Sequence, residues 1–510
     1  MGVSEAPSRS TAEAPGVPPP DPAPLAQQTL AYGLSGLLVP IVGMITLPIF
    51  ARVFTRSQYG LIELGTTMMT VALAITDAGM TSAVLRSFYD YRGHEERERR
   101  SVILTGFLAT TLLAFVLTTA MVVFRADISR WVFGRRDEGT LVVVIAASIP
   151  ALNTWRYVSE VMRIRLQAFN YLVLTLIAAT VTTVLGVVGV LALGWRVEGV
   201  FFAALVGNIA AAAYGVVVVR SGLTGRFSRP ELKRMLAYGL PLVPAILAAW
   251  ALALVDRIIL SRLGSLAQVG QYAIANRLAS LLMIALTAFL FALTPFLLST
   301  YAEDPAQEKA ARARTLTYLT FILSLVGLVL TLFAKEIIDV VAPRFSEAYK
   351  AVGPLMLGAV GYGLVSVLTV GFSIARKTGR LALLAVMAAA VNIGLNFALI
   401  PPFGIVGAAF ATAVGYGFLA ASYYWVSQRV YPTPYEPKKV LTTLALASVL
   451  GVAGVLPLGP LGVAIAVKLL ALTVFVAGVR LTGIMTGAEF SELRRFMVGM
   501  IPARLSRTRA

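Results

Sequence analysis

The sequence predicts an all-α polytopic membrane protein with about 14 transmembrane helices. The chain has 510 residues, of which 58% are hydrophobic and 13% charged, and its mean hydropathy is +0.81. Soluble globular domains average about 45–50% apolar and about 25% charged residues. A membrane-spanning helix needs about 20 apolar residues, so a chain of this length has room for fourteen. The composition therefore excludes an ordinary soluble enzyme, a disordered chain and a coiled coil.

Apolar segments follow one another along the chain with short breaks. We expect helices at 28–50, 59–85, 102–124, 140–162, 170–193, 199–219, 237–260, 270–298, 315–334, 351–374, 381–400, 404–427, 440–459 and 461–482. Residues 1–24 are rich in Pro, Ala and Ser and contain no apolar run, so they predict a disordered N-terminal tail. Residues 483–510 form a polar C-terminal tail, in which 488–502 has the pattern of a short interfacial helix.

The basic residues fix the expected orientation. The formal net charge of +18 is typical of a nucleic-acid-binding protein, but the charges lie in the breaks between apolar segments. If the N-terminus is inside, 29 Lys and Arg residues lie on the inner side and 12 on the outer side. This bias predicts a protein of the cell (cytoplasmic) membrane with both termini in the cytoplasm, and no nucleic-acid partner.

An internal repeat organises the helices into two lobes. The matches, offset by 204 to 210 residues, are Ala31-Tyr32-Gly33-Leu34 with Ala237-Tyr238-Gly239-Leu240, Val39-Pro40 with Val243-Pro244, Arg52, Gln58 and Gly60 with Arg262, Gln268 and Gly270, and GVFFAALVG at 199–207 with GAAFATAVG at 407–415. Each unit holds six helices, an even number, so both copies enter the membrane from the same side and the repeat is parallel. Such repeats enclose a cavity between two lobes.

The domain boundaries follow from the repeat. The expected order is a tail at 1–24, an N-lobe at 25–220, a cytoplasmic linker at 221–236, a C-lobe at 237–427, two further helices at 428–482, and a cytoplasmic tail at 483–510.

No catalytic machinery of the soluble kind is visible. The chain has no Cys and one His, and it lacks the GxxxxGK[ST], HExxH and GxSxG motifs. Its extramembrane segments are too short for a separate catalytic domain. We therefore expect no enzyme activity, no metal and no cofactor, and passage across the membrane as the function.

Ionisable residues within or beside the helices are the candidate site, because a charge in hydrocarbon is costly unless it faces water or a partner. The substrate-binding candidates are Arg277, Asn276, Arg52, Arg262, Arg86 and Arg156, the ion-coupling candidates are Asp77 and Asp256, and the gating candidates are Pro40, Pro241 and Pro244. Basic residues outnumber acids, and the arginine fork matches phosphate, so this set favours a phosphate-bearing substrate.

Structural roles compete with several of these assignments. Arg52 and Arg262 also suit helix C-termini, where cations complement the dipole, and Arg86 and Arg156 suit membrane anchors. Asp256 also suits a local pair with Arg257 or Arg262, and Arg277 a structural pair with Asp77 or Asp256. Glu63 is interpreted as a helix-entry residue stabilised by the N-terminus of its helix.

Four segments resemble the polysaccharide-transporter branch of the multidrug/oligosaccharidyl-lipid/polysaccharide (MOP) exporter superfamily. They are LPIFARVFTRSQYGLIELGTTM (47–68), TDAGMTSAVLRSFYD (76–90), GQYAIANRLASLL (270–282) and FGIVGAAFATAVGYG (403–417). The resemblance covers about 25–482 and implies a fourteen-helix, two-lobed flippase that works by alternating access. The implied substrate is an undecaprenyl-pyrophosphate-linked oligosaccharide, moved from the inner to the outer leaflet for cell-surface polysaccharide biosynthesis.

The resemblance also implies a role for basic cavity residues in holding the pyrophosphate and sugar acids, and Arg277 fits that role best. Relatives that flip the peptidoglycan precursor carry arginine-rich first helices, whereas this chain has no charge between residues 30 and 51. The implied partners are membrane lipid and other polysaccharide-assembly proteins. Coupling to a proton, a sodium ion or the membrane potential stays open.

Two alternatives remain. A MOP-type exporter of drugs or metabolites would need acidic cavity residues and usually has twelve helices. A membrane-embedded polysaccharide polymerase or glycosyltransferase would need a catalytic loop, for which 125–139 offers Asp127, Asp137 and Glu138.

Overall fold

The computed structural model describes residues 42–91, 95–303, 305–374, 379–457 and 459–483, together with Gly33, Ser35 and Gly36. These residues are almost entirely helical and contain no strand. The helices are Val42–Val53, α2 (Arg56–Asp77), α3 (Met80–Asp90), α4 (Glu96–Val123), α5 (Arg125–Phe133), α6 (Gly139–Ile164), α7 (Ala168–Ala192), α8 (Val197–Val219), η1 (Arg220–Thr224), α9 (Arg229–Gly239), η2 (Leu240–Leu242), α10 (Val243–Leu263), α11 (Leu266–Glu303), α12 (Pro305–Leu332), α13 (Ala334–Val341), η3 (Pro343–Ala348), α14 (Tyr349–Ile374), α15 (Gly379–Val430), α16 (Pro437–Gly451), η4 (Val452–Gly454) and α17 (Leu461–Leu481).

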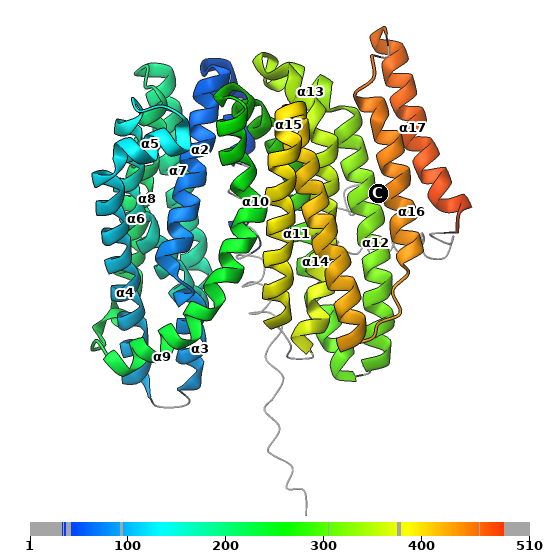
Figure 1. Cartoon of the computed structure of the whole chain (residues 1–510). Coiled ribbons are helices and arrows are strands. Elements are labelled where there is room, and N and C mark those ends of the chain that lie inside the picture. Colours follow the sequence, from blue (N-terminus) through cyan, green and yellow to red (C-terminus); the bar gives the residue numbers. More distant parts are fainter. Residues whose placement is uncertain are drawn as a thin grey trace, which may run out of the picture.

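The helices form two bundles that stand side by side (Figure 1). In the N-lobe, α6 packs against α4 and α8, and α7 packs against α8. In the C-lobe, α15 packs against α10 and α14, and α12 packs against α14. The last two helices flank the C-lobe, where Phe475 of α17 stacks on Phe321 of α12 at 5.9 Å. The predicted all-α fold of two six-helix lobes plus two C-terminal helices is confirmed.

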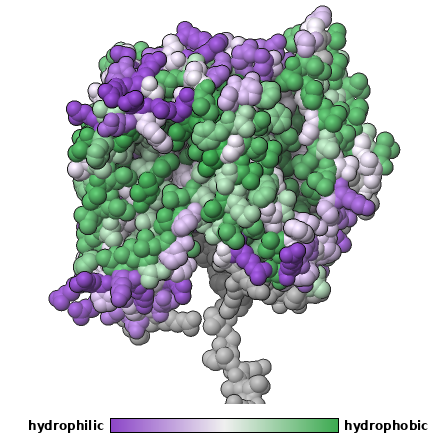
Figure 2. All heavy atoms as spheres, in the orientation of Figure 1, coloured by the Kyte–Doolittle hydropathy of each residue, from purple (hydrophilic) through white to green (hydrophobic). Residues whose placement is uncertain are grey.

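The surface matches a membrane protein. Eleven helices of the described chain are long and apolar enough to span a bilayer. Figure 2 shows a hydrophobic band across the middle of the face in view, with hydrophilic residues gathered at its two ends. Large apolar side chains such as Leu112, Phe115 and Trp425 are exposed, as lipid-facing residues are. The chain is a multi-pass membrane protein.

The helix α15 contains two of the predicted spans. It continues from Gly379 to Val430, but Gly404 has a φ of 53°, which breaks the helical path directly after Pro401 and Pro402. The two halves run antiparallel, because the Tyr423 hydroxyl near the end donates to the Leu381 carbonyl near the start at 3.1 Å. The predicted helices 381–400 and 404–427 therefore form a tight hairpin.

The predicted helix 59–85 is interrupted. A capping box between Thr55 and Gln58 starts α2 in regular fashion. The helix then stops at Ala78 and Gly79, whose φ values of 46° and 73° lie in the left-handed region. A non-glycine residue there is unusual and gave no signal in the sequence.

Several segments expected as loops or linkers are helical. The expected linker 221–236 holds most of η1 and the start of α9, whose N-terminus is capped by the Ser228 hydroxyl. The expected outer loop 125–139 contains α5. Pro241 lies in η2 between α9 and α10, and Pro244 lies in the first turn of α10, so this span is broken where bending was expected.

Some predictions fall outside the described residues. These are Pro40, the tail at 1–24 and nearly all of the tail at 483–510, including the interfacial helix at 488–502.

Candidate functional site

The two lobes meet at the end of the molecule that carries α5 and α13, called here the α5–α13 end. There α2 of the N-lobe crosses α11 of the C-lobe at Gly60 and Gly270. A Cβ on Gly60 would lie 2.1 Å from the Leu266 carbonyl oxygen, and one on Gly270 would lie 2.1 Å from the Arg56 carbonyl oxygen. Only glycine permits this approach on both helices. The repeat-related glycines thus form the point of contact between the lobes.

Two repeat-related arginines reinforce this contact. Arg52 of the N-lobe donates from Nη2 to the Val340 carbonyl of α13 at 3.1 Å. Arg262 of the C-lobe donates from Nη1 to the Arg130 carbonyl of α5 at 2.8 Å. Donors and acceptors are both offset by 210 residues, so the two bonds are related by the same repeat. Both arginines are exposed at the rim of the molecule, away from the lobe interior.

A buried charge cluster lies deeper between the lobes. Arg257 of α10 donates from Nε to the Glu63 carboxylate of α2 at 2.8 Å, and from Nη1 to the Asp256 carboxylate at 2.8 Å. Arg257 is 3% exposed and Glu63 is 8% exposed. Tyr272 and Thr412 also donate to Asp256. Removing one partner of such a pair strongly destabilises a protein, because the other charge is left buried and unpaired.

The pair between Glu63 and Arg257 was not predicted from the sequence. Glu63 was interpreted as a helix-entry residue, which was wrong because its carboxylate binds Arg257 across 194 residues of sequence. Arg257 was considered only as a neighbour of Asp256, which it does contact. One signal for this pair was available in the sequence. Glu63 is a carboxylate in an apolar helix with no basic residue one turn away, and such a charge needs a distant partner.

Arg277 lies where the two lobes approach each other. It is half-buried on α11, beside the half-buried Asn276. Its Nη1 lies 3.1 Å from the position of a Cβ on Gly43, in the first described helix of the N-lobe. It also lies close enough to Tyr59 and Glu63 of α2 for electrostatic interaction. Its guanidinium is therefore directed from the C-lobe towards the N-lobe.

A polar cavity of about 260 Å³ lies between the N-lobe and α10. Its lining includes two of the predicted residues, Asp77 and Arg156, together with Asn153, Glu160 and Trp250. We call it the Asp77 pocket. The Asp77 carboxylate accepts from the Thr81 backbone N–H at 3.1 Å and so caps α3. The sequence separated Asp77 from Arg156 by 79 positions, and the packing of α2 on α6 brings them to one cavity.

Arg86 lies apart from both sites. It is exposed on α3, and its guanidinium lies 4.6 Å from the centre of the Tyr238 ring of α9. This cation–π contact joins the N-lobe to the segment that leads into α10.

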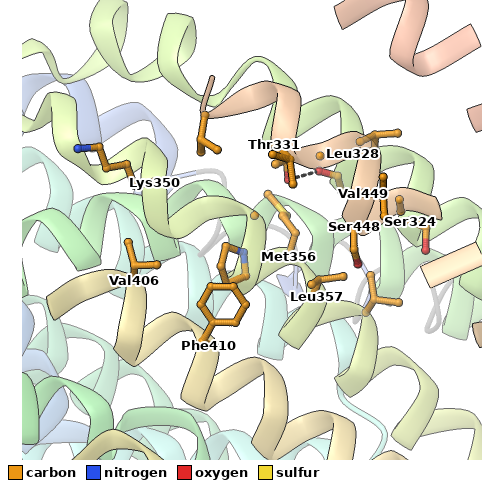
Figure 3. Close-up of a pocket in the computed structure, with 18 residues that line it drawn as sticks. Ser324, Leu328, Thr331, Lys350, Met356, Leu357, Val406, Phe410, Ser448 and Val449 are labelled. Carbon is orange, nitrogen blue, oxygen red and sulfur yellow. Dashed lines mark hydrogen bonds between the residues drawn. The ribbon is translucent and has the colours of Figure 1, made fainter. Parts of the chain in front are cut away.

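A second cavity, of about 450 Å³, lies on the C-lobe between α12, α14, α15 and α16 (Figure 3). Two of its hydroxyl groups are occupied by helix carbonyls, since Thr331 donates to Gly327 and Ser448 donates to Leu444, both at 2.7 Å, whereas the buried Ser324 hydroxyl has no hydrogen-bond partner among the described residues. Lys350 at its edge is paired with Glu347. None of the predicted site residues lines it. Such an apolar wall cannot replace the hydration of a charged group.

A comparison with known protein families shows to which family the chain belongs. A family described as polysaccharide biosynthesis protein matches residues 25–301, which is more than half of the sequence. The chain belongs to this family. A membrane protein from Methanocaldococcus jannaschii, itself uncharacterized, is 21% identical over 441 residues, covering 80% of this chain and 84% of that protein.

Solved structures place this family member in the MOP fold. The lipid II flippase MurJ, in an inward closed conformation, superposes with a TM-score of 0.69 at 14% identity, covering 89% of this chain and 98% of MurJ. An inward-facing multidrug resistance MATE transporter of the MOP superfamily has a TM-score of 0.59 at 16% identity, covering 79% and 94%. A MOP superfamily transporter from Pyrococcus furiosus has a TM-score of 0.59 at 14% identity, covering 80% and 95%. The predicted MOP-like fold is confirmed.

Proposed function

We propose that this protein is a flippase for a lipid-linked oligosaccharide carried on undecaprenyl pyrophosphate. It moves glycan repeat units from the inner to the outer leaflet of the cytoplasmic membrane, for cell-surface polysaccharide biosynthesis. Membership of a polysaccharide biosynthesis family supports the glycan, and the MOP fold supports transport. Binding and passage need no bond to be made or broken, so the protein acts without catalysis, alongside other polysaccharide-assembly proteins.

Arg277 carries the proposal. A pyrophosphate crossing about 30 Å of hydrocarbon must exchange its hydration for fixed positive charge. Arg277 supplies a guanidinium that is half-buried between the lobes, where its planar fork can bind phosphate oxygens. Arg52, Arg86, Arg156 and Asn276 are secondary candidates, and Arg262 joins Arg52 at the rim.

Alternating access follows from the lobe contacts. We assign the α5–α13 end to the outer face and the opposite end, with α9, to the cytoplasm, as the distribution of basic residues favours. The same distribution supports our proposal that both termini are cytoplasmic. The crossing at Gly60 and Gly270 and the Glu63–Arg257 pair then hold the outer face closed. Rocking of the lobes must break these contacts to release the substrate outwards. The broken span around Pro241 and Pro244 is the proposed hinge, with Pro40 at the matching place in the first helix.

Ion coupling is assigned to Asp256 in preference to Asp77. The Asp256 carboxylate shares Arg257 with Glu63, so a proton or cation bound to Asp256 changes the strength of the contact between the lobes. In Asp256→Asn, we expect flipping to lose its dependence on pH or sodium. A dependence equal to that of the unaltered protein would remove Asp256 from coupling.

The test of the main proposal is reconstituted flipping. Proteoliposomes receive an undecaprenyl-pyrophosphate-linked oligosaccharide, and the fraction exposed in the outer leaflet is measured with a glycosidase that cannot cross the membrane. Arg277→Ala is expected to abolish flipping, and Arg277→Lys to retain part of it, because lysine keeps the charge without the fork. Arg314→Ala, at an exposed position on α12, is the matched control. Equal flipping by Arg277→Ala and the control would exclude Arg277 from the site.

A further inference from the structure

The Asp77 pocket contains a buried donor that no hydrogen bond among the described residues uses. Asn153 is 3% exposed, and among the described residues its Nδ2 has no hydrogen-bond partner. Three hydroxyls of the lining are occupied, since Thr110 donates to the Phe107 carbonyl at 3.2 Å, Tyr157 to the Ile103 carbonyl at 2.7 Å, and Thr81 to the Asp77 carboxylate. A buried amide donor without a partner costs free energy. The cost is offset when a ligand supplies an acceptor.

The remaining polar groups of the pocket are a mixture of donors and acceptors. Asp77 and Glu160 contribute carboxylate oxygens, and Asn153 and Arg156 contribute N–H groups. The lining thus holds two carboxylates and one guanidinium, and Glu160 is paired at 2.9 Å with Arg163, which is not part of the lining. Unpaired donors and a guanidinium oppose a bare cation, which takes oxygen ligands only. The lining has two carboxylates and only one arginine, so its negative charge disfavours the binding of a pyrophosphate as well.

Size and shape favour a sugar ring. The volume of about 260 Å³ equals about nine liquid waters at about 30 Å³ each. Covalently linked atoms pack more closely than separate waters, so the space suits one pyranose ring of about a dozen non-hydrogen atoms. Trp250 of α10 provides an aromatic wall, on which the apolar C–H face of a sugar can lie. Because α10 closes the cavity, the ring would lie between the lobe bundles, as the proposed path requires.

We propose that the Asp77 pocket binds one uncharged sugar ring of the transported glycan, with Asp77 and Glu160 accepting from its hydroxyls and Asn153 and Arg156 donating to its oxygens. This inference rests on the proposed function and extends it, since it divides the substrate between two places. Arg277 holds the pyrophosphate, and the Asp77 pocket selects the sugar.

The test compares three lipids on the full-length protein in nanodiscs by native mass spectrometry. The lipids are undecaprenyl pyrophosphate without sugar, with one neutral hexose, and with one hexuronic acid. We expect the neutral hexose to strengthen binding relative to the sugar-free lipid. Asn153→Leu is expected to lower the affinity for the hexose-bearing lipid about fivefold, which corresponds to the loss of about one hydrogen bond. It is expected to leave the affinity for the sugar-free lipid unchanged. Asn170→Leu, on the same lobe outside the pocket, is the matched control and is expected to keep the full gain.

A second variant separates recognition from folding. Asp77→Asn keeps an oxygen that can cap α3 at Thr81, so it preserves the local structure while removing the charge. It is expected to reduce the hexose gain in the same way. The proposal is overturned if either variant retains the full gain, if the hexuronic acid binds more tightly than the neutral hexose, or if sodium displaces the hexose.

The outcomes distinguish the pocket from the proposed function. If the sugar-free lipid binds and Arg277→Ala weakens it, while the hexose adds nothing, only the pocket proposal fails. If none of the three lipids binds the unaltered protein, the flippase proposal itself fails.

Discussion

Replacing Glu63 by Gln should open the contact between the lobes at the α5–α13 end without unfolding the protein. Arg257 bonds both Glu63 and Asp256 at 2.8 Å, so the variant leaves it paired with Asp256. A glutamine oxygen can still accept the Arg257 Nε–H, but the bond is no longer between two charges. Hydrogen bonds involving charged groups contribute about 1.5–3 kcal/mol, and neutral ones about 0.5–1.5 kcal/mol.

The variant should thus lose about 1.4 kcal/mol of the free energy that favours the closed state over the open one. This loss corresponds to a tenfold change in the ratio of closed to open molecules. The effect acts on this equilibrium because both side chains are buried in the closed state and would be hydrated once the lobes separate. Truncation of Arg257 would instead leave Glu63 and Asp256 buried and unpaired, at a cost of about 3–5 kcal/mol, and is a poorer test because folding would suffer.

The chain has no native cysteine, so a spin label attaches only at the two cysteines introduced for each measurement. Spin labels at Val123 and Val340, which are 68% and 70% exposed at the α5–α13 end of opposite lobes, report the opening. Labels at Phe169 and Leu383, exposed near the opposite end, report the complementary closing. Pulsed dipolar spectroscopy should show a longer distance for the first pair and a shorter one for the second.

The matched control is Glu347→Gln, which removes the same charge from an exposed pair with Lys350. Exposed pairs contribute little, so both distance distributions should stay as in the unaltered protein. Unchanged distances in Glu63→Gln, or an equal change in Glu347→Gln, would refute the assignment of the Glu63–Arg257 pair as the closing contact.

Three further predictions concern packing and charge. Gly60→Ala should prevent full closure and abolish transport, because its Cβ would meet a carbonyl oxygen at 2.1 Å, whereas Gly462→Ala, in open space, should not. Burial raises the pKa of Glu336, but the hydrogen bond and charge of Lys468 lower it by more. Their contact therefore stabilises the fold above the ordinary Glu pKa and is lost as pH falls through the lowered one. For Lys468→Met, thermal unfolding should show a loss of stability at pH 7 that shrinks as the pH falls below the ordinary Glu pKa. Ala78→Gly should raise stability by about 1 kcal/mol, measured by denaturant unfolding, because φ at this position is 46°.

Most of the fold could be predicted from the sequence because hydrocarbon imposes length and composition on each helix. The hairpin of α15 is an example, since Pro401, Pro402 and Gly404 mark the break in plain sequence. The short helices α5 and α13 were not predicted, because they are polar enough to resemble loops. The break at Ala78 lies against Gly239 of α9, a contact that leaves no trace in composition.

The candidate site was predictable only in part. Arg277 could be found because a lone charge deep in an apolar segment needs an explanation. The Glu63–Arg257 pair could not, because it joins helices 194 residues apart and each residue had a plausible local role. The Asp77 pocket likewise depends on how α2, α6 and α10 pack, which residue spacing along a single helix does not determine.

The two repeat copies share the backbone contacts between the lobes but not the buried charges. At an offset of 210 residues, glycine faces glycine and each rim arginine has its counterpart, so backbone contacts are shared by both copies. The charges are not shared, since Glu63 corresponds to Ala273, Arg257 to Leu47 and Arg277 to Thr67. Duplication therefore supplies a symmetric frame that can close. The charges break the symmetry of that frame, and they are where substitutions should change transport without changing the fold.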